Sequence, residues 1–115
     1  MNTVATLLSA QALTASGSEA AGHVPGAPLS AGSDSVSVQV IVSAATGTTP
    51  SATFSLLWSN DNVTFSPAAP ADVFAAITAV GSVVQRFAVK GQYFKIAWTV
   101  TGTTPSLTTT AYAYS

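Results

Sequence analysis

The feature that most constrains the fold is a repeated unit in which a short Gly- and Pro-containing peptide stands between two alternating segments. The hexapeptide Thr-Gly-Thr-Thr-Pro-Ser occurs at Thr46–Ser51 and again, letter for letter, at Thr101–Ser106. On both sides of the first copy and before the second, apolar and polar residues alternate with a period of two, which is typical of strands with one buried face. The sequence therefore predicts an all-β fold with a strand–TGTTPS–strand internal repeat.

The alternating segments also predict which side chains fill the core. Before the first copy, "SVSVQVIVSA" places every valine at an even position, and "ATFSLLWS" after it continues with Phe, Leu and Trp on one face. The segment "QYFKIAWTV" alternates in the same way before the second copy, and the segment after it is rich in Thr and Tyr, which favour strands. The predicted core residues are Val38, Val40, Phe54, Leu56, Trp58, Phe87, Phe94, Ile96 and Trp98.

Two roles fit the hexapeptide itself. Gly47 and Gly102 can take a positive φ at no steric cost, and Pro50 and Pro105 hold the preceding threonine extended, so the peptide suits a tight hairpin turn. The alternative is a ligand-binding loop used twice. The residue types favour hairpin turns, and we expect the two turns at the same end of the fold, related by an approximate twofold axis.

The remaining segments complete the expected architecture. Leu7–Ser16, Val73–Ala79 and Ser82–Val89 are predicted strands, although the latter two are also compatible with an Ala-rich helix; Pro67 and Pro70 predict a loop. The expected fold is a single antiparallel β-sandwich of jelly-roll type with about seven strands.

The domain is expected to span residues 1–115, with residues 1–35 forming an N-terminal strand and an irregular segment. Within that part, Ser18–Ser33 contains five Gly and Pro residues and is expected to be an extended arm or a long loop. Met1–Ser16 superficially resembles a signal peptide. It has no positive charge and its apolar stretch is interrupted by Ser9 and Gln11, so we expect it to belong to the mature protein.

Composition limits the classes of partner. Charged residues make up 6% of the chain, against about 25% in typical domains, and the net charge is −1. Such a chain has no field to attract nucleic acid or an anionic membrane, and no apolar run approaches the ~20 residues of a membrane span. Low charge instead suggests contact with other protein. The absence of cysteine excludes disulfides and thiolate metal sites.

The sequence offers little for catalysis or metal binding. His23 stands in a Gly- and Pro-rich segment with no second histidine to complete a metal site or a catalytic dyad. Asp61 and Asp72 are the two carboxylates that a fold could unite for glycoside hydrolysis. The run from Asn60 to Asn62 begins like a calcium loop but lacks its further acidic ligands, so a turn closed by Asx side chains is favoured. We predict no enzyme activity, no catalytic, cofactor-binding or metal-binding residue, and no small-molecule ligand.

Two exposed features remain. Tyr112 and Tyr114 share one strand face and fit either a protein interface or a stacking platform for a sugar ring. Arg86, Lys90 and Lys95 form the one basic spot in the sequence, and they are expected to be a solvated strand end because three charges are too few for a nucleic-acid site.

Two motifs carry a resemblance to a known group of proteins. Ser59, Asp61 and Phe65 match the pattern S-x-D-x-x-x-[WF], and the aromatic strand Tyr93–Val100 runs into a G-T-[ST]-P-S turn. In this respect the part from Val36 to Ser115 resembles small β-sandwich virion proteins of tailed bacteriophages.

That resemblance implies a non-enzymatic structural protein. The leading expectation is a capsid decoration (cement) protein that binds the major capsid protein as a homotrimer and stabilises the assembled head. It would be made in the cytoplasm of the host bacterium and lie on the capsid surface of the virion. The alternative is a receptor- or carbohydrate-binding module on a tail or fibre, in which Tyr112 and Tyr114 would contact the glycan. A tail-tube or tail-terminator component is a third possibility. The resemblance implies no catalytic residue.

Overall fold

The computed structural model describes residues 4–19 and 35–114, and in these ranges every regular element is a strand. The six strands are β1 (Val4–Leu13), β2 (Gly17–Ser18), β3 (Ser35–Ser59), β4 (Ser66–Val73), β5 (Gly81–Ala88) and β6 (Tyr93–Tyr114). All of their pairings are antiparallel. The predicted all-β class is confirmed. The described residues contain no helix long and apolar enough to cross a membrane.

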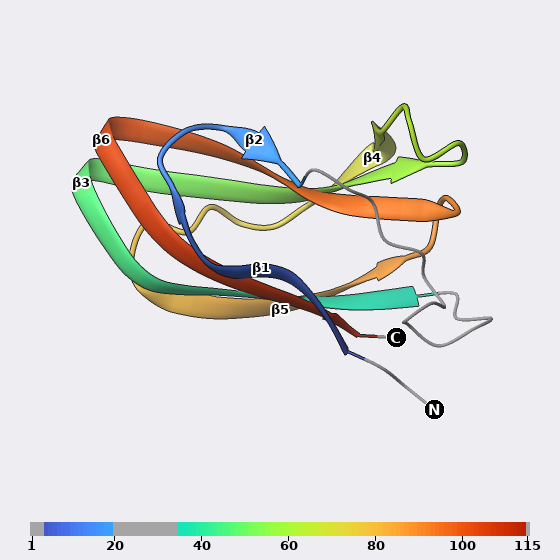
Figure 1. Ribbon diagram of the computed structural model, residues 1–115, viewed down its shortest axis with the longest axis horizontal. Coiled ribbons are helices and arrows are strands. Elements are labelled where there is room, and N and C mark those ends of the chain that lie inside the picture. Colours follow the sequence, from blue (N-terminus) through green and yellow to red (C-terminus); the bar gives the residue numbers. More distant parts are fainter. Residues whose placement is uncertain (1–3, 20–34, 115) are drawn as a thin grey trace.

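Two long central strands organise the molecule. β3 and β6 pair with each other along almost their whole length, from Ser37 opposite Tyr114 to Ser59 opposite Tyr93. Both strands bend sharply at the same place, at the left in Figure 1, so that the sheet folds back and one half lies over the other.

Each half contains four strands. The first half-sheet consists of residues 35–45 of β3 and 107–114 of β6, with β1 and β5 at its edges. The second half-sheet consists of residues 52–59 of β3 and 93–100 of β6, with β2 and β4 at its edges. All six strands nevertheless belong to one hydrogen-bonded sheet. The finer expectation of a sandwich with jelly-roll connections is therefore not confirmed.

The prediction that both hexapeptides are hairpin turns is wrong. Each copy lies in the interior of a long strand, and the two copies pair with one another: Thr46 faces Ser106, and Ser51 faces Thr101. Register shifts interrupt the ladder here, as in a bulge that bends a strand without reversing it. We call this place, formed by Thr46–Ser51 and Thr101–Ser106, the corner.

The backbone of the corner explains why the same six residues serve both strands. Gly47 has φ 106° and Gly102 has φ 119°, while Thr49 and Thr104 have φ 47° and 46°. A Cβ atom at Gly47 would lie 2.6 Å from the carbonyl oxygen of Thr104, and one at Gly102 would lie 2.7 Å from that of Thr49. Each glycine thus packs against the other copy, in the expected twofold relation.

The core lies between the two half-sheets. All nine predicted core residues are buried, including Trp58 and Trp98, which are 6% and 8% exposed. The inward side chains of the central strands alternate with half-buried or exposed outward ones, which is the origin of the period of two in the sequence. Further buried apolar residues are Leu7, Leu8, Leu13, Val36, Val42, Ala52, Phe74, Leu107, Ala111 and Ala113.

The edge strands differ from the expected ones. Pro67 and Pro70 lie within β4 and not in a loop, which an edge strand permits because its outer N–H groups need no partner. The predicted strand Val73–Ala79 is absent: past Val73 the segment contacts β3 through a hydrogen bond from the Phe74 N–H to the Phe54 carbonyl oxygen and an isolated bridge between Ile77 and Ala52.

The other two predicted strands are present with shifted bounds. β5 corresponds to the predicted strand Ser82–Val89, and the helical alternative is excluded. β1 corresponds to Leu7–Ser16 but begins and ends three residues earlier. Of the predicted arm Ser18–Ser33, Ser18 and Glu19 are described; Glu19 exchanges hydrogen bonds with the backbone of Ile96, and the rest of the arm lies outside the described residues.

Candidate functional site

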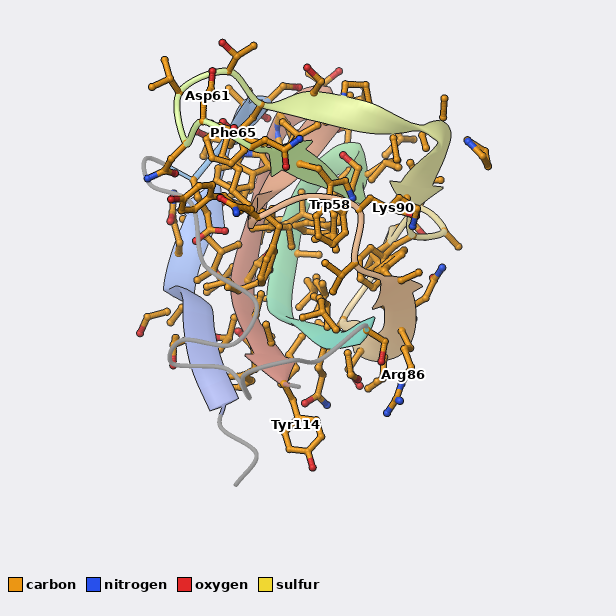
Figure 2. The ribbon with its side chains drawn as sticks, turned by 90° about the vertical axis from the view of Figure 1, so that its right-hand side faces the viewer. Trp58, Asp61, Phe65, Arg86, Lys90 and Tyr114 are labelled. Carbon is orange, nitrogen blue, oxygen red and sulfur yellow. The ribbon has the colours of Figure 1, made fainter. Side chains whose placement is uncertain are left out.

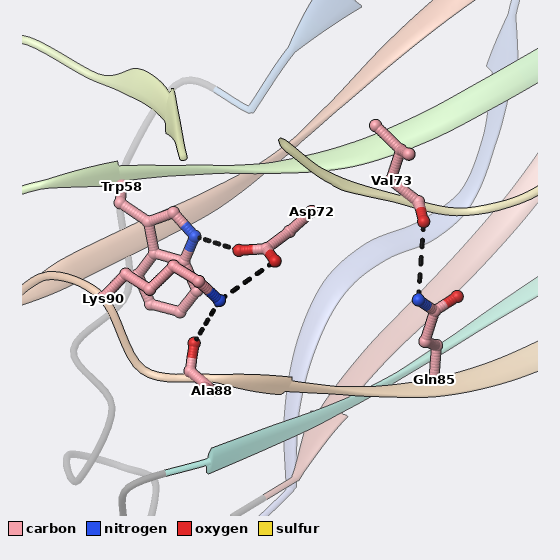
Figure 3. A network of polar contacts seen from close by, with 6 residues as sticks. All are labelled: Trp58, Asp72, Val73, Gln85, Ala88 and Lys90. Carbon is pink, nitrogen blue, oxygen red and sulfur yellow. Dashed lines mark hydrogen bonds and ion pairs between the residues drawn. The ribbon is translucent and has the colours of Figure 1, made fainter. Parts of the chain in front are cut away.

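A polar network closes the open end of the folded sheet, opposite the corner (Figure 3). The indole Nε1 of Trp58 donates a hydrogen bond of 2.7 Å to Oδ2 of Asp72. The ammonium group of Lys90 donates to Oδ1 of Asp72 at 3.0 Å and to the carbonyl oxygen of Ala88 at 3.1 Å, and it lies 5.8 Å from the centroid of the Trp58 ring. Both carboxylate oxygens of Asp72 therefore have a partner.

This network connects the two half-sheets. Trp58 and Asp72 belong to β3 and β4 of the second half-sheet, whereas Lys90 follows β5 of the first. A longer contact of 3.5 Å from the Gln85 side chain to the carbonyl oxygen of Val73 also joins β5 to β4. Because the Asp72 side chain is only 11% exposed, its ion pair with Lys90 is better shielded from water than a surface pair. We call the Trp58–Asp72–Lys90 network the tie.

A hollow with a volume of about 310 Å³ lies beside the tie. Its wall presents amides, hydroxyls and one ammonium group. This ammonium group belongs to Lys90 and is already paired with Asp72. The lining residues are Trp58, Ser59, Asn60, Thr64, Ser66, Pro67, Ala68, Lys90 and Gly91. The arrangement suits a structural connection better than proton transfer.

The loop after β3 is the Asx turn that the sequence favoured over a calcium loop. Oδ1 of Asp61 accepts hydrogen bonds from the backbone N–H groups of Val63 and Thr64, both at 2.9 Å, and from the hydroxyl of Ser59 at 2.7 Å. The Val63 bond, followed by the Ser59 and Thr64 bonds, lowers the pKa of Asp61 to about 2. Oδ1 of Asp61 is thus occupied by the turn itself.

Phe65, the last residue of the motif behind the resemblance, is not part of the buried core. It is half-buried, and the Lys95 ammonium lies 4.6 Å from its ring centroid. In Figure 2, Asp61 and Phe65 lie above and to the left of Trp58 and Lys90. The motif therefore specifies a loop and its anchor on β6.

A second hollow, of about 350 Å³, lies on the outer face of the first half-sheet. It is lined by Ser37, Gln39, Val84, Tyr112 and Tyr114. Gln39 stands opposite both Tyr112 and Val84, so the hollow crosses β6, β3 and β5. Val84 and Tyr114 are 60% and 40% exposed, and Figure 2 shows Tyr114 extending away from the body. We call these five residues the tyrosine face.

The predicted basic spot is divided among three places. Lys90 belongs to the tie, Lys95 contacts Phe65, and Arg86 on β5 has a 3.4 Å hydrogen bond to the Ser35 hydroxyl. This does not form the joint patch that a nucleic-acid site requires.

The candidate carboxylates also have separate partners. Asp61 binds its own turn, and Asp72 binds Trp58 and Lys90. Within residues 4–19 and 35–114, no group of three His, Cys, Asp or Glu side chains is placed to hold a metal ion. His23 lies outside the described residues. That the chain has no catalytic, cofactor-binding or metal-binding residue stays a prediction.

The tie is the feature that the sequence did not reveal, although a weak signal existed. A buried indole needs an acceptor for its N–H. Trp98 donates to the carbonyl oxygen of Ala15 at 3.1 Å, whereas Trp58 uses Asp72, one of the few charged residues in the chain. The need for an acceptor was predictable, but its identity depends on the pairing of β3 with β4.

Comparison with known proteins finds a similar fold among solved structures. No protein-family model matches the sequence, and no curated protein matches it either. Among solved structures, the crystal structure of the SPBc2 prophage-derived protein YomS has a similar fold, with a TM-score of 0.55 and 14% sequence identity. The match covers 100% of this chain and 94% of that chain. At this identity the likeness establishes a shared fold, which extends over the whole folded sheet.

Proposed function

We propose that this chain is a non-enzymatic structural protein of a tailed bacteriophage particle that decorates the outside of the assembled head. The observation that carries the proposal is the match in fold, along the full length of the chain, to a prophage-derived protein. The low charge and the resemblance of the Ser59–Phe65 motif to those of small virion proteins support it. The proposed partner is the major capsid protein.

The geometry suits a cementing role because the molecule is closed at both ends. At the corner both central strands pass from one half-sheet to the other, with each glycine packed on the opposite copy, and the tie joins the half-sheets again at the open end. In this proposal the two half-sheets act as the layers of a sandwich, a rigid block whose outer faces and edges contact neighbouring capsid subunits. A protein that binds only the assembled shell stabilises it by mass action.

The first test is the location of the chain in purified particles of the phage that encodes it. Mass spectrometry of separated heads and tails, with antibody labelling of intact particles, should detect the chain on heads. Heads lacking the chain should lose their DNA at lower temperature, and adding the purified protein should restore their resistance. Absence from particles, or presence in tails alone, would contradict the proposal.

A second candidate is favoured by the tyrosine face. Tyr112 and Tyr114, two residues apart on β6, border a shallow hollow together with the polar side chains of Gln39 and Ser37, a combination suited to stacking on a sugar ring and binding its hydroxyls. In this alternative the chain is a receptor- or carbohydrate-binding module of a tail or fibre.

A glycan array probed with the wild-type protein and with Tyr112→Ala separates the two candidates. Binding to a host glycan that the variant loses would support the tail or fibre module. Val63→Ala is the matched control, because Val63 is 81% exposed and belongs to the loop after β3. No binding to any glycan would remove the support for this candidate.

A further inference from the structure

The four edge strands of the folded sheet differ in how they resist pairing with another strand. An exposed edge presents unpaired backbone N–H and C=O groups, and natural proteins usually protect such edges with prolines, bulges, charges or short strands. Three of the four edges here carry such protection. β2 has two residues, β4 contains Pro67 and Pro70, and the ladder of β1 is interrupted by register shifts between Thr6 and Leu8 and between Leu8 and Gln11.

β5 is the exception. Its eight residues pair with β3 in unbroken register, from Ser35 opposite Ala88 to Val42 opposite Gly81. It contains no proline, and its one charge is Arg86. Among the described residues, no strand pairs with its outer edge. Most of its side chains are exposed, and the exposed fraction of Val84 is 60%. A long, regular and almost uncharged edge is a template for another strand.

The usable length of this edge points to one arrangement. The ammonium group of Lys90 already donates to the carbonyl oxygen of Ala88, which leaves Gly81–Phe87 for pairing. The midpoint of this segment is Val84. An antiparallel pairing with an identical strand, centred on Val84, uses all seven residues and places Arg86 opposite Ser82 of the partner subunit. A centre at Arg86 would instead set two guanidinium groups opposite each other, which is unfavourable.

We propose that β5 pairs with β5 of a second copy of this chain about a twofold axis at Val84. The two first half-sheets then form one continuous antiparallel sheet of eight strands. Directly opposite residues of an antiparallel pair point to the same side. Both tyrosine faces therefore lie on one surface of the dimer, which becomes a bivalent surface.

This interface also bears on the number of copies. A closed ring of three copies through β5 would require β5 to pair with a different edge of the next copy, and the other edges are the protected ones. Pairing of β5 with itself gives a dimer, in place of the homotrimer that the resemblance implies. Because a seven-residue strand pair covers less than the roughly 1,600 Å² of a standard interface, we expect a dimer that dissociates on dilution.

Cross-linking tests the proposed centre directly, because the chain has no cysteine. In Val84→Cys the two new thiols face each other across the axis, where paired Cα atoms lie about 4.5–5.5 Å apart, within reach of a disulfide. Under mild oxidation we expect most of this variant to run as a covalent dimer on a non-reducing gel. Val63→Cys, at a position that is more exposed than Val84 but lies in the loop after β3, should stay monomeric. Equal cross-linking of both variants, or none of Val84→Cys, would overturn the proposal.

Sedimentation velocity over a range of concentrations provides the second test. The wild-type protein and Val63→Lys should show a reversible dimer, whereas Val84→Lys, which sets two ammonium groups across the axis, should be monomeric at every concentration. A wild-type monomer, a trimer, or an unchanged Val84→Lys dimer would contradict the proposed interface. Neither test involves phage particles, so the dimer can be refuted or supported whether or not the chain decorates a head.

Discussion

The two half-sheets are joined by identical corner peptides, yet their central strands bury side chains of very different size. Three, five and seven residues after the hexapeptide, the second half-sheet buries large side chains and the first buries small ones. The matched pairs are Phe54 and Thr109, Leu56 and Ala111, and Trp58 and Ala113. On the other side of the corner the same contrast holds between Phe94, Ile96 and Trp98 in the second half-sheet and Val38, Val40 and Val42 in the first.

The difference shows that a repeated backbone does not require repeated packing. Facing sheet layers lie about 10 Å apart, and the side chains of both layers share the space between them, which they fill at the packing density of an organic crystal. Large central side chains of one half-sheet therefore require small ones opposite. Apart from Leu107, directly after the corner, the first half-sheet places its large side chains at its edges, with Leu7, Leu8 and Leu13 on β1 and Phe87 on β5.

The largest expected effect comes from truncating a large central side chain. Trp98→Ala should lower the free energy of unfolding by about 3–5 kcal/mol. Val42→Ala should cost roughly 1–3 kcal/mol; Val42 is the counterpart of Trp98 because it pairs with Thr109 as Trp98 pairs with Phe54. Urea denaturation followed by circular dichroism measures both. A loss below about 1 kcal/mol for Trp98→Ala would mean that the indole is not part of the core and would erase the contrast between the half-sheets.

Equivalent substitutions in the two hexapeptides of the corner should have equal effects on stability, whereas those in the two halves of the core should not. Gly47→Ala and Gly102→Ala should each destabilise by roughly 1–3 kcal/mol, because both glycines have positive φ and a Cβ would collide with backbone of the other copy. Gly81→Ala is the matched control, since a Cβ there would meet nothing within 4 Å. Thermal unfolding of the three variants checks this. A neutral Gly102→Ala, or two clearly unequal corner variants, would argue against the reciprocal packing.

The tie should contribute less to the free energy of unfolding than the core tryptophan or the corner glycines. Asp72→Ala leaves the largely buried Trp58 Nε1 without its acceptor, which should cost about 1–2 kcal/mol. In a Trp58→Phe background, where that donor is already gone, the same substitution should cost measurably less. A double-mutant cycle in urea measures the coupling. Equal costs in both backgrounds would mean that the hydrogen bond from the Trp58 indole to Asp72 does not contribute to stability.

The smallest effect concerns the loop after β3, which connects two strands of the second half-sheet. The hydrogen bonds that lower the pKa of Asp61 from 3.8 to about 2 favour the carboxylate in the folded state. Its stabilising contribution is therefore complete above about pH 4 and is lost as the pH falls toward 2. An NMR titration of the Val63 and Thr64 amides should give this low midpoint. Asp61→Asn should keep the turn and lose the titration, and a midpoint near 3.8 in the wild type would contradict the turn geometry.

Sequence reasoning succeeded where the controlling interaction is local. The period of two places Val38 and Phe54 in the core because a strand alternates its faces whatever its partner is. The Asx turn at Asp61 was likewise predictable, since Ser59, Asp61 and the backbone bonds of the turn lie within six residues.

Sequence reasoning failed where the structure depends on contacts between segments that are far apart in the chain. Gly47 with a positive φ and Pro50 fit a hairpin and a bulged bend equally well, and the choice depends on the second copy lying alongside. Pro67 fits β4 because β4 is an edge, which the sequence does not state. The Asp72–Lys90 pair depends on the approach of β4 to the end of β5, and so does the position of the tie.

The path of β6 through both half-sheets has a consequence for how the chain folds during synthesis. β3 is complete by residue 59, but the strand that pairs with it along its length begins at Tyr93 and ends at Tyr114. At a synthesis rate of about 5–20 residues per second, several seconds pass between the synthesis of β3 and that of its central partner β6. The interval is longer for β1, because its ladder partners are residues 107–114. The second half-sheet needs residues 93–100 of β6 and the first needs residues 107–114, so each half-sheet can form only after its own part of β6 has been synthesised.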